Sequence, residues 1–305
     1  MLHADARKKF CAYKKEKQKA SVLPKVQKTP ILERMIEEFE KYDFKSSAIR
    51  VEHSSGRIFL VDYNCGDAAK GPVQNNELLE QITSDDVENF SLILAGLRFT
   101  YDHEKEVSTF FYHLMNNCRD NSFMIHTAGF LRRPSLIVPK GKSLVIKGDV
   151  LDVTTEEGAS AEVFGNACGL AYNSMGVKIT VHGSVIAGSD IGKHMGIHMG
   201  KRMRGTEIQI HGNVSNNHVG LVMSGGSITV HGNSSNCRIG AGMCRGTIRL
   251  LGPTGRIGGS KSRGAQVLER SPMTGGEIYI EDSFKGLGLI EGGRIYHKGK
   301  LIVDK

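Results

Sequence analysis

The second half of the chain repeats with a period close to 20 residues, and this repeat limits the possible folds more than any other feature. Residues 206–223 read TEIQIHGNVSNNHVGLVM, and residues 226–243 read GSITVHGNSSNCRIGAGM. Six strand-like segments each close with a glycine, at intervals of 17, 18, 29, 20 and 20 residues: Gly148, Gly165, Gly183, Gly212, Gly232 and Gly252. Self-similarity at a fixed period is typical of solenoids, in which each repeat contacts only its neighbours.

Apolar and polar residues alternate within each repeat, as in Ile208/Ile210 and Ile228/Val230. Period-two alternation predicts a strand with one buried face, and parallel strands from successive repeats can bury that face together. Two further columns recur once per repeat: Ile191-Gly192, Val219-Gly220, Ile239-Gly240 and Ile257-Gly258, then Met195, Met223 and Met243. Three columns per turn predict a parallel β-helix over residues 139–305, with structural glycines at its corners.

A histidine follows the inward residues in three repeats, so alternation points His182, His211 and His231 outward. Stacked repeats would bring these imidazoles about 4.8 Å apart. Three imidazoles in a column could bind zinc or copper, which makes them the metal candidates of the chain. The alternative is that a repeated position stacks in any solenoid, and we expect no bound metal.

Two of the longer repeats carry basic insertions, expected at Gly196–Met203 and Gly259–Thr274. Insertions in solenoids form loops on one face, often the binding face. These segments and their flanks supply the candidates for binding a partner or an anion: His194, His198, Lys201, Arg202, Arg204, Lys261, Arg263 and Arg270. The alternative is two loops without a ligand.

The first half differs in composition, because only 5 of the 37 glycines precede residue 141. Residues 29–138 predict an α+β domain: a helix capped by Thr29-Pro30, a hairpin around Ser54–Gly56, a helix at Asp102–Asn117 and a strand from Ser122. Residues 1–28 hold nine Lys or Arg against Asp5 and Glu16, a basic arm suited to nucleic acid or an acidic partner. The alternative is a solvated segment without a specific role.

The hydrophobic fraction of 39% and the charged fraction of 24% are those of a globular protein. We expect no membrane span, because no run of eighteen apolar residues occurs. The first residues lack the apolar core of a secretory signal, and the six cysteines form no CxxC pair, so we expect free thiols in the cytoplasm.

The sequence lacks G-x-S-x-G, a complete P-loop and a strand–GxGxxG–helix unit. Asp149, Asp152, Glu156 and Glu157 cluster near the domain junction and are interpreted as a solvated loop rather than an acid–base pair. We therefore expect no catalytic residue and no cofactor.

The unit G-G-x-I-x-V-x-G-[ND] followed by [IV]-G-x-x-M recurs within residues 142–300 and resembles the GXGXG family. That family includes one subunit of formylmethanofuran dehydrogenase, named here the dehydrogenase GXGXG subunit, and the C-terminal domain of the glutamate synthase large subunit. The resemblance implies a right-handed β-helix without catalytic residues of its own. The sequence pattern HGN…IGAGM is more similar to the dehydrogenase GXGXG subunit than to the synthase domain.

The resemblance implies a scaffold that holds the subunits of a redox enzyme together, here as part of an oxidoreductase complex. A glutamate-synthase-type role in nitrogen assimilation is the first alternative. A second is binding of nucleic acid or another anionic partner through the basic arm. A third is an enzyme site on the β-helix surface, which would need a pocket with polar groups of perturbed pKa.

Overall fold

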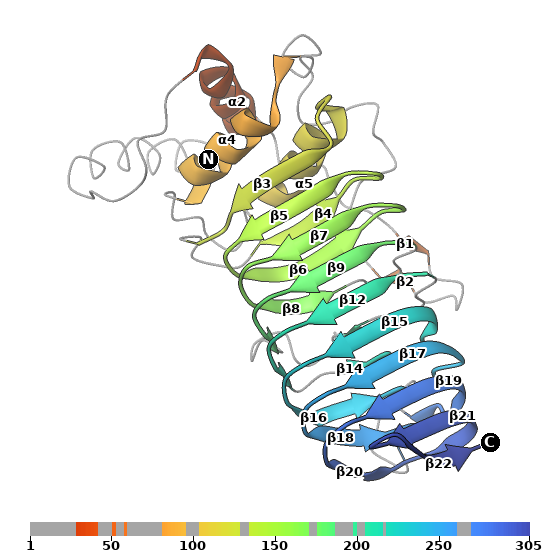
Figure 1. Ribbon diagram of the computed structural model, residues 1–305. Coiled ribbons are helices and arrows are strands. Elements are labelled where there is room, and N and C mark those ends of the chain that lie inside the picture. Colours follow the sequence, from red (N-terminus) through yellow and green to blue (C-terminus); the bar gives the residue numbers. More distant parts are fainter. Residues whose placement is uncertain are drawn as a thin grey trace.

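A computed structural model gives the fold of the protein (Figure 1). It describes residues 29–41, 51–52, 58–59, 81–95, 104–128, 134–170, 176–186, 198–199, 205–215, 218–260 and 270–305. The longest of the described helices has 14 residues, fewer than the roughly 20 that a membrane-spanning helix needs.

Most of the described chain is a parallel β-solenoid, in which successive turns add strands to three sheets (Figure 1). The turn that begins at β12 continues through β13 and β14 before it returns at β15. The largest sheet, called here the long sheet, has ten strands: β3 (Ser122–His126), β5 (Ser143–Lys147), β7 (Ser160–Val163), β9 (Lys178–Val181), β12 (Glu207–Ile210), β15 (Ser224–Val230), β17 (Arg245–Leu250), β19 (Met273–Ile280), β21 (Ile290–His297) and β22 (Lys300–Asp304).

The other two sheets have five strands each, and all of their pairings are parallel. The second sheet contains β4 (Ser135–Val138), β6 (Val150–Thr155), β8 (Ala167–Leu170), β10 (Val185–Ile186) and β13 (Val214–Ser215). The third sheet contains β11 (His198–Met199), β14 (His218–Val219), β16 (Ser234–Ile239), β18 (Thr254–Ile257) and β20 (Phe284–Leu287). Only β22 departs from the parallel pattern of the long sheet, since it folds back antiparallel on β21.

The predicted inward register of the repeat is confirmed. Ile179, Ile208, Ile228, Ile248 and Ile278 are consecutive Cα partners across the long sheet, and each is 0% exposed. Each side chain therefore packs against its own equivalents in the turns before and after it. Burial of one such side chain contributes about 2 kcal/mol, so the stacked interior is the main stabilising element of the solenoid.

The closing glycines of the repeats form a column in which neighbouring backbones touch. Gly183 donates its N–H to the carbonyl oxygen of Gly165 at 3.1 Å, and Gly212 donates to Gly183 at 3.0 Å. A Cβ on Gly212 would lie 2.4 Å from the Gly183 oxygen, too close for any side chain. The close approach of successive turns is thus what requires glycine here.

A methionine column supports the next corner of the coil. The Cε of Met223 lies against Gly246 and the Cε of Met243 against Gly276, where a Cβ would be 2.6 and 2.4 Å away. Both glycines also have positive φ angles, 100° and 86°. The column continues at Met273, and the buried thioethers fill the space that the missing side chains leave.

Helices cover the N-terminal end of the solenoid (Figure 1): α2 (Pro30–Lys41), α4 (Ser84–Ala95) and α5 (Glu104–Asn117). Phe39, Phe90 and Phe110 meet between them, with ring centroids 5.0 to 5.7 Å apart. The predicted N-cap is confirmed, since Thr29 Oγ1 accepts the N–H of Leu32 at 3.1 Å. The predicted hairpin pairs β1 (Val51–Glu52) with β2 (Ile58–Phe59), while α4 has no counterpart in the sequence-based prediction.

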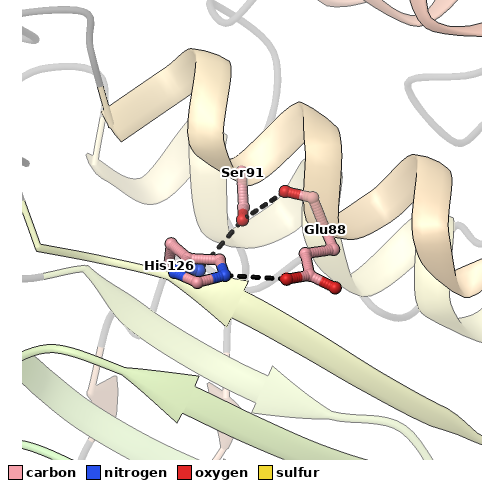
Figure 2. A network of polar contacts seen from close by, with 3 residues as sticks. All are labelled: Glu88, Ser91 and His126. Carbon is pink, nitrogen blue, oxygen red and sulfur yellow. Dashed lines mark hydrogen bonds and ion pairs between the residues drawn. The ribbon is translucent and has the colours of Figure 1, made fainter. Parts of the chain in front are cut away.

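Helix α4 also satisfies the free edge of the first strand of the long sheet, as Figure 2 shows. Ser91 Oγ accepts the N–H of His126 at 2.9 Å and donates to the carbonyl oxygen of Glu88 at 2.7 Å. The His126 ring lies 2.9 Å from a Glu88 carboxylate oxygen. The helix therefore satisfies the backbone N–H of His126 at a strand edge that would otherwise leave it unpaired.

The solenoid begins before the boundary predicted at residue 139. Strand β3 pairs in parallel with β5, and β4 pairs in parallel with β6, so residues 122–138 belong to the solenoid sheets. Thr127 occupies the corner position that Gly148 takes in the next turn. Among the described residues no earlier turn approaches that corner, so it needs no glycine, and the first turn lacks the signal used to place the boundary.

The insertion predicted at Gly196–Met203 was wrongly placed. Met199 is the Cα partner of Val219, and Glu207 is the partner of Ser227. The chain takes eight residues from Met199 to Glu207 and eight from Val219 to Ser227, so nothing is inserted between β11 and β12.

The extra residues lie before β11 instead, because the chain takes 14 residues from Val185 to Met199 but only five from Val214 to Val219. The column position predicted for Ile191 is therefore taken by Met199. Ile191 and Met195 themselves lie outside the described residues.

Candidate docking surfaces

The outer edge of the long sheet carries a column of stacked rings. Phe164 stacks on His182 with centroids 4.3 Å apart, His182 on His211 at 5.3 Å, and His211 on His231 at 4.7 Å. Lys147 Nζ lies 3.4 Å from the centroid of Phe164, on the N-terminal side of the column. All three histidines are exposed, as the alternation predicts, and Phe164 is exposed as well.

This stacking is poor geometry for the metal site considered above. The rings are nearly parallel, with interplanar angles of 11° for His182–His211 and 25° for His211–His231. Two nitrogens that bind one zinc ion at about 2.1 Å are at most about 4.2 Å apart, and their lone pairs must converge. Parallel rings separated by 4.7 to 5.3 Å direct their nitrogens side by side instead. Glu162, at 2.7 Å, is the hydrogen-bond partner of His182.

Charges on the outward face of the long sheet are largely neutralised by their neighbours. Glu277 and Arg294 form an ion pair, and Lys178 Nζ lies 3.9 Å from Glu207. Tyr279 donates its hydroxyl to Glu277 at 2.7 Å, and this hydrogen bond raises the pKa of the phenol. Both acidic and basic groups thus lie on this face, which gives it no single sign of charge.

The third sheet differs, because its outward positions form a basic column, defined here as His198, His218, Arg238 and Arg256. Their Cα atoms are consecutive register partners on β11, β14, β16 and β18. Val219, Ile239 and Ile257, which follow the last three members, are each 0% exposed, so alternation directs His218, Arg238 and Arg256 outward. Sequence reasoning missed three of these four residues, although the pattern [HR]-[MVI]-G recurs at each of them.

A shallow hollow of about 710 Å³ lies at the corner that precedes the long sheet, lined by Gly205, Ser224, Gly225, Cys244 and Arg245. Cys244 is an exposed free thiol, 3.6 Å from the carbonyl oxygen of Met223. Within the residues that the structure describes, no group of three or more metal-ligating side chains is assembled here or elsewhere.

One carboxyl group of the second sheet has a perturbed protonation. Burial raises the pKa of Asp152 to about 6, although a hydrogen bond from the backbone of Val153 opposes the shift. The other acidic residues of the predicted junction cluster have identified partners: Asp149 accepts from Asn166, Glu156 from Tyr112, and Glu157 pairs with Lys140. They do not form a carboxylate pair with Asp152.

Most of the predicted anion-binding residues lie outside the described residues: His194, Lys201, Arg202, Arg204, Lys261 and Arg263. His198 lies in β11, and its Cα position places it at the start of the basic column. Arg270 is exposed where the chain returns after the second insertion. The basic arm, residues 1–28, is also outside the described part of the chain.

Comparisons with protein-family models, with curated proteins and with solved structures found no match for this chain. Membership of the GXGXG family therefore stays a prediction from the sequence motif.

Proposed function

We propose that the protein is a non-catalytic docking scaffold, a structural subunit of a multisubunit oxidoreductase, whose solenoid holds a partner on its outer surface. The observation that carries the proposal is the solenoid itself, with three sheets that run parallel along one body. Stacked turns give extended surfaces on which outward residues recur at fixed spacing, and repeat proteins use such surfaces for binding. The right-handed coil and the cytoplasmic location expected from the sequence are part of this proposal.

The kind of complex follows from the resemblance alone. The dehydrogenase GXGXG subunit favours a metal-dependent hydrolase or a molybdenum or tungsten protein as the partner. The glutamate synthase domain favours glutamate-synthase components and a role in nitrogen assimilation. The structure adds a reason to expect a partner of either kind, since the long sheet carries an ordered column of exposed histidine rings.

The proposal is tested by purifying the tagged full chain from its native source at low salt and identifying the proteins that elute with it at fixed stoichiometry. We expect one or two subunits of a redox enzyme to remain bound through size-exclusion chromatography. Elution of the chain alone at every salt concentration would refute a scaffold role. Material that is lost on nuclease treatment would favour the alternative, a nucleic-acid binding protein that uses the basic arm.

A further inference from the structure

We propose that the outward face of the last four strands of the long sheet is the docking site for an extended segment of a partner subunit, with one acidic and two apolar side chains. This inference rests on the proposed scaffold function and names the surface and the partner chemistry that the scaffold uses. The site is called here the tyrosine patch. Its members are consecutive Cα partners on β17, β19, β21 and β22 (Figure 1): Arg249, Tyr279, Tyr296 and Leu301.

The chemistry of this outward column changes where the patch begins. The isoleucine that precedes each of the first three members is 0% exposed, so alternation directs these three side chains outward. In the four preceding strands of the sheet the same column holds only polar residues: Glu162, Thr180, Gln209 and Thr229. Polar residues are therefore sufficient to form this face of the sheet, and the two tyrosines and the leucine of the last strands need a further explanation.

The patch has the composition of a protein-binding surface. Tyr279 and Tyr296 stack with centroids 4.7 Å apart and rings within 4° of parallel, and both are partly exposed. Leu301 continues the column at 48% exposure, the highest value among the large apolar side chains of the described chain. Charged side chains border the tyrosines on one side, where Glu277 pairs with Arg294. An apolar centre that contains tyrosine and lies beside charged groups is typical of protein interfaces.

Arg249 supplies the charge that a partner must match. Its guanidinium carbon lies 5.0 Å from the centroid of the Tyr279 ring, so the ring positions this exposed cation over the column. Among the described residues no carboxylate forms an ion pair with Arg249. Glu277, on the next strand, already accepts from the Tyr279 hydroxyl and pairs with Arg294. The N–H donors of Arg249 are therefore available to a carboxylate of the partner, which a guanidinium can bind through two parallel hydrogen bonds.

The spacing of the patch fits an extended chain that runs along the solenoid axis. Adjacent strands are about 4.8 Å apart, which places the centre of the tyrosine stack about 7 Å from Arg249 and Leu301 about 14 Å from it. Side chains on one face of an extended chain recur about every 6.8 Å. A carboxylate followed by two apolar groups at this interval therefore matches Arg249, the tyrosine stack and Leu301 in turn. The bound segment thus has the pattern acidic-x-apolar-x-apolar, in one of the two chain directions.

The test measures binding of two fluorescein-labelled peptides, GSETLTLSG and GSLTLTESG, to the full chain by fluorescence anisotropy at low salt. They present the pattern in the two chain directions, and we expect one of them to bind. Arg249→Glu should weaken that binding about tenfold, because an attraction becomes a repulsion. The control Arg256→Glu makes the same change in net charge at an exposed position of the third sheet and should weaken binding less than about twofold. Equal affinities of the two variants, or no binding of either peptide by the parent chain at about 0.5 mM, would overturn the inference.

Two further variants test direct contact at each end of the patch. Replacing Glu by Lys in the bound peptide should abolish its binding to the parent chain and restore binding to Arg249→Glu, and a failure of this charge swap would contradict contact at Arg249. Leu301→Ser should weaken binding of the unchanged peptide about threefold, because an exposed apolar contact is removed. An unchanged affinity would contradict the apolar part of the pattern.

The native complex separates failure of this site from failure of the scaffold function. We expect Arg249→Glu/Leu301→Ser to lose the partner and Arg256→Glu to retain it. A partner retained by both variants refutes this docking site but leaves the scaffold function intact, whereas a parent chain without any partner refutes the scaffold function itself. A parent chain that is dimeric by size-exclusion chromatography, and monomeric as Leu301→Ser, would assign the patch to a second copy and overturn the choice of a partner subunit.

Discussion

The glycine column offers the sharpest test of the stacked coil, through Gly232→Ala. A Cβ at this position would lie 2.4 Å from the Gly212 carbonyl oxygen, and contacts under 3.0 Å essentially never occur. The two turns must therefore separate by at least about 0.6 Å at this corner. The hydrogen bond from Gly232 N–H to Gly212 O, now 3.1 Å long, would then exceed the range of a hydrogen bond.

Two neighbouring bonds lengthen with it, from His231 N–H to Ile210 O at 2.9 Å and from Asn233 N–H to Asn213 Oδ1 at 2.8 Å. Three weakened hydrogen bonds cost about 3 kcal/mol at about 1 kcal/mol each. Replacing glycine also reduces the entropy of the unfolded chain, which returns up to about 1 kcal/mol. The free energy of unfolding should therefore fall by about 2 kcal/mol.

The assay is urea unfolding followed by circular dichroism, with Gly141→Ala as the control. Gly141 has a φ of +70°, and its Cβ would meet no atom within 4 Å. The left-handed conformation costs an alanine about 1 kcal/mol, which the same entropic gain largely offsets, so this variant should stay within about 0.5 kcal/mol of the parent chain. If Gly232→Ala were as stable as Gly141→Ala, the backbones would not be in contact at this corner.

Three further predictions test the interior, the perturbed carboxyl group and the histidine column. Ile228→Asp buries an unpaired charge at a position that is 0% exposed and should lower the free energy of unfolding by about 4 kcal/mol. The control Thr229→Asp, on the outward face, should change this free energy by less than about 1 kcal/mol. Equal urea midpoints for the two variants would contradict the inward register of Ile228. Because the pKa of Asp152 is raised to about 6, its contribution to stability is full below about pH 4 and is lost as the pH rises through about 6. Asp152→Asn should therefore raise the free energy of unfolding by about 2 kcal/mol at pH 7.5 and leave it unchanged at pH 4. A difference in this free energy that does not depend on pH would contradict the raised pKa. The stacked rings direct their nitrogens side by side, which does not suit a zinc site. Added zinc should therefore raise the melting temperature of the parent chain no more than that of His211→Ala. A larger rise in the parent chain would support the metal site after all.

The fold of the second half was predictable from sequence because the determinants are local and repeated. Alternation assigns Ile208 and Ile228 to one face wherever the turns stack, and the recurring glycine marks the corner of each turn. The position of the insertion was not predictable from the same pattern. Two segments, Ile191–Met195 and Met199–Met203, both read x-G-x-x-M, and periodicity cannot choose between them. The pairing of Met199 with Val219 decides it.

The candidate site was less predictable than the fold. The basic column is formed by one residue per repeat, so Arg238 and Arg256 are 18 positions apart in the sequence and adjacent in the sheet. A search for clusters along the chain therefore found the basic runs near Lys201 and Lys261 and passed over the column. The capping role of Ser91 and His126 was hidden for the same reason, because a helix and a strand distant in sequence meet only at the end of the solenoid.

Native mass spectrometry of the tagged full chain, purified from its native source at low salt, shows whether the solenoid is a docking scaffold. We expect a single assembly whose mass equals that of this chain plus one or more different subunits at fixed stoichiometry. A spectrum that contains only the mass of the chain itself would contradict it.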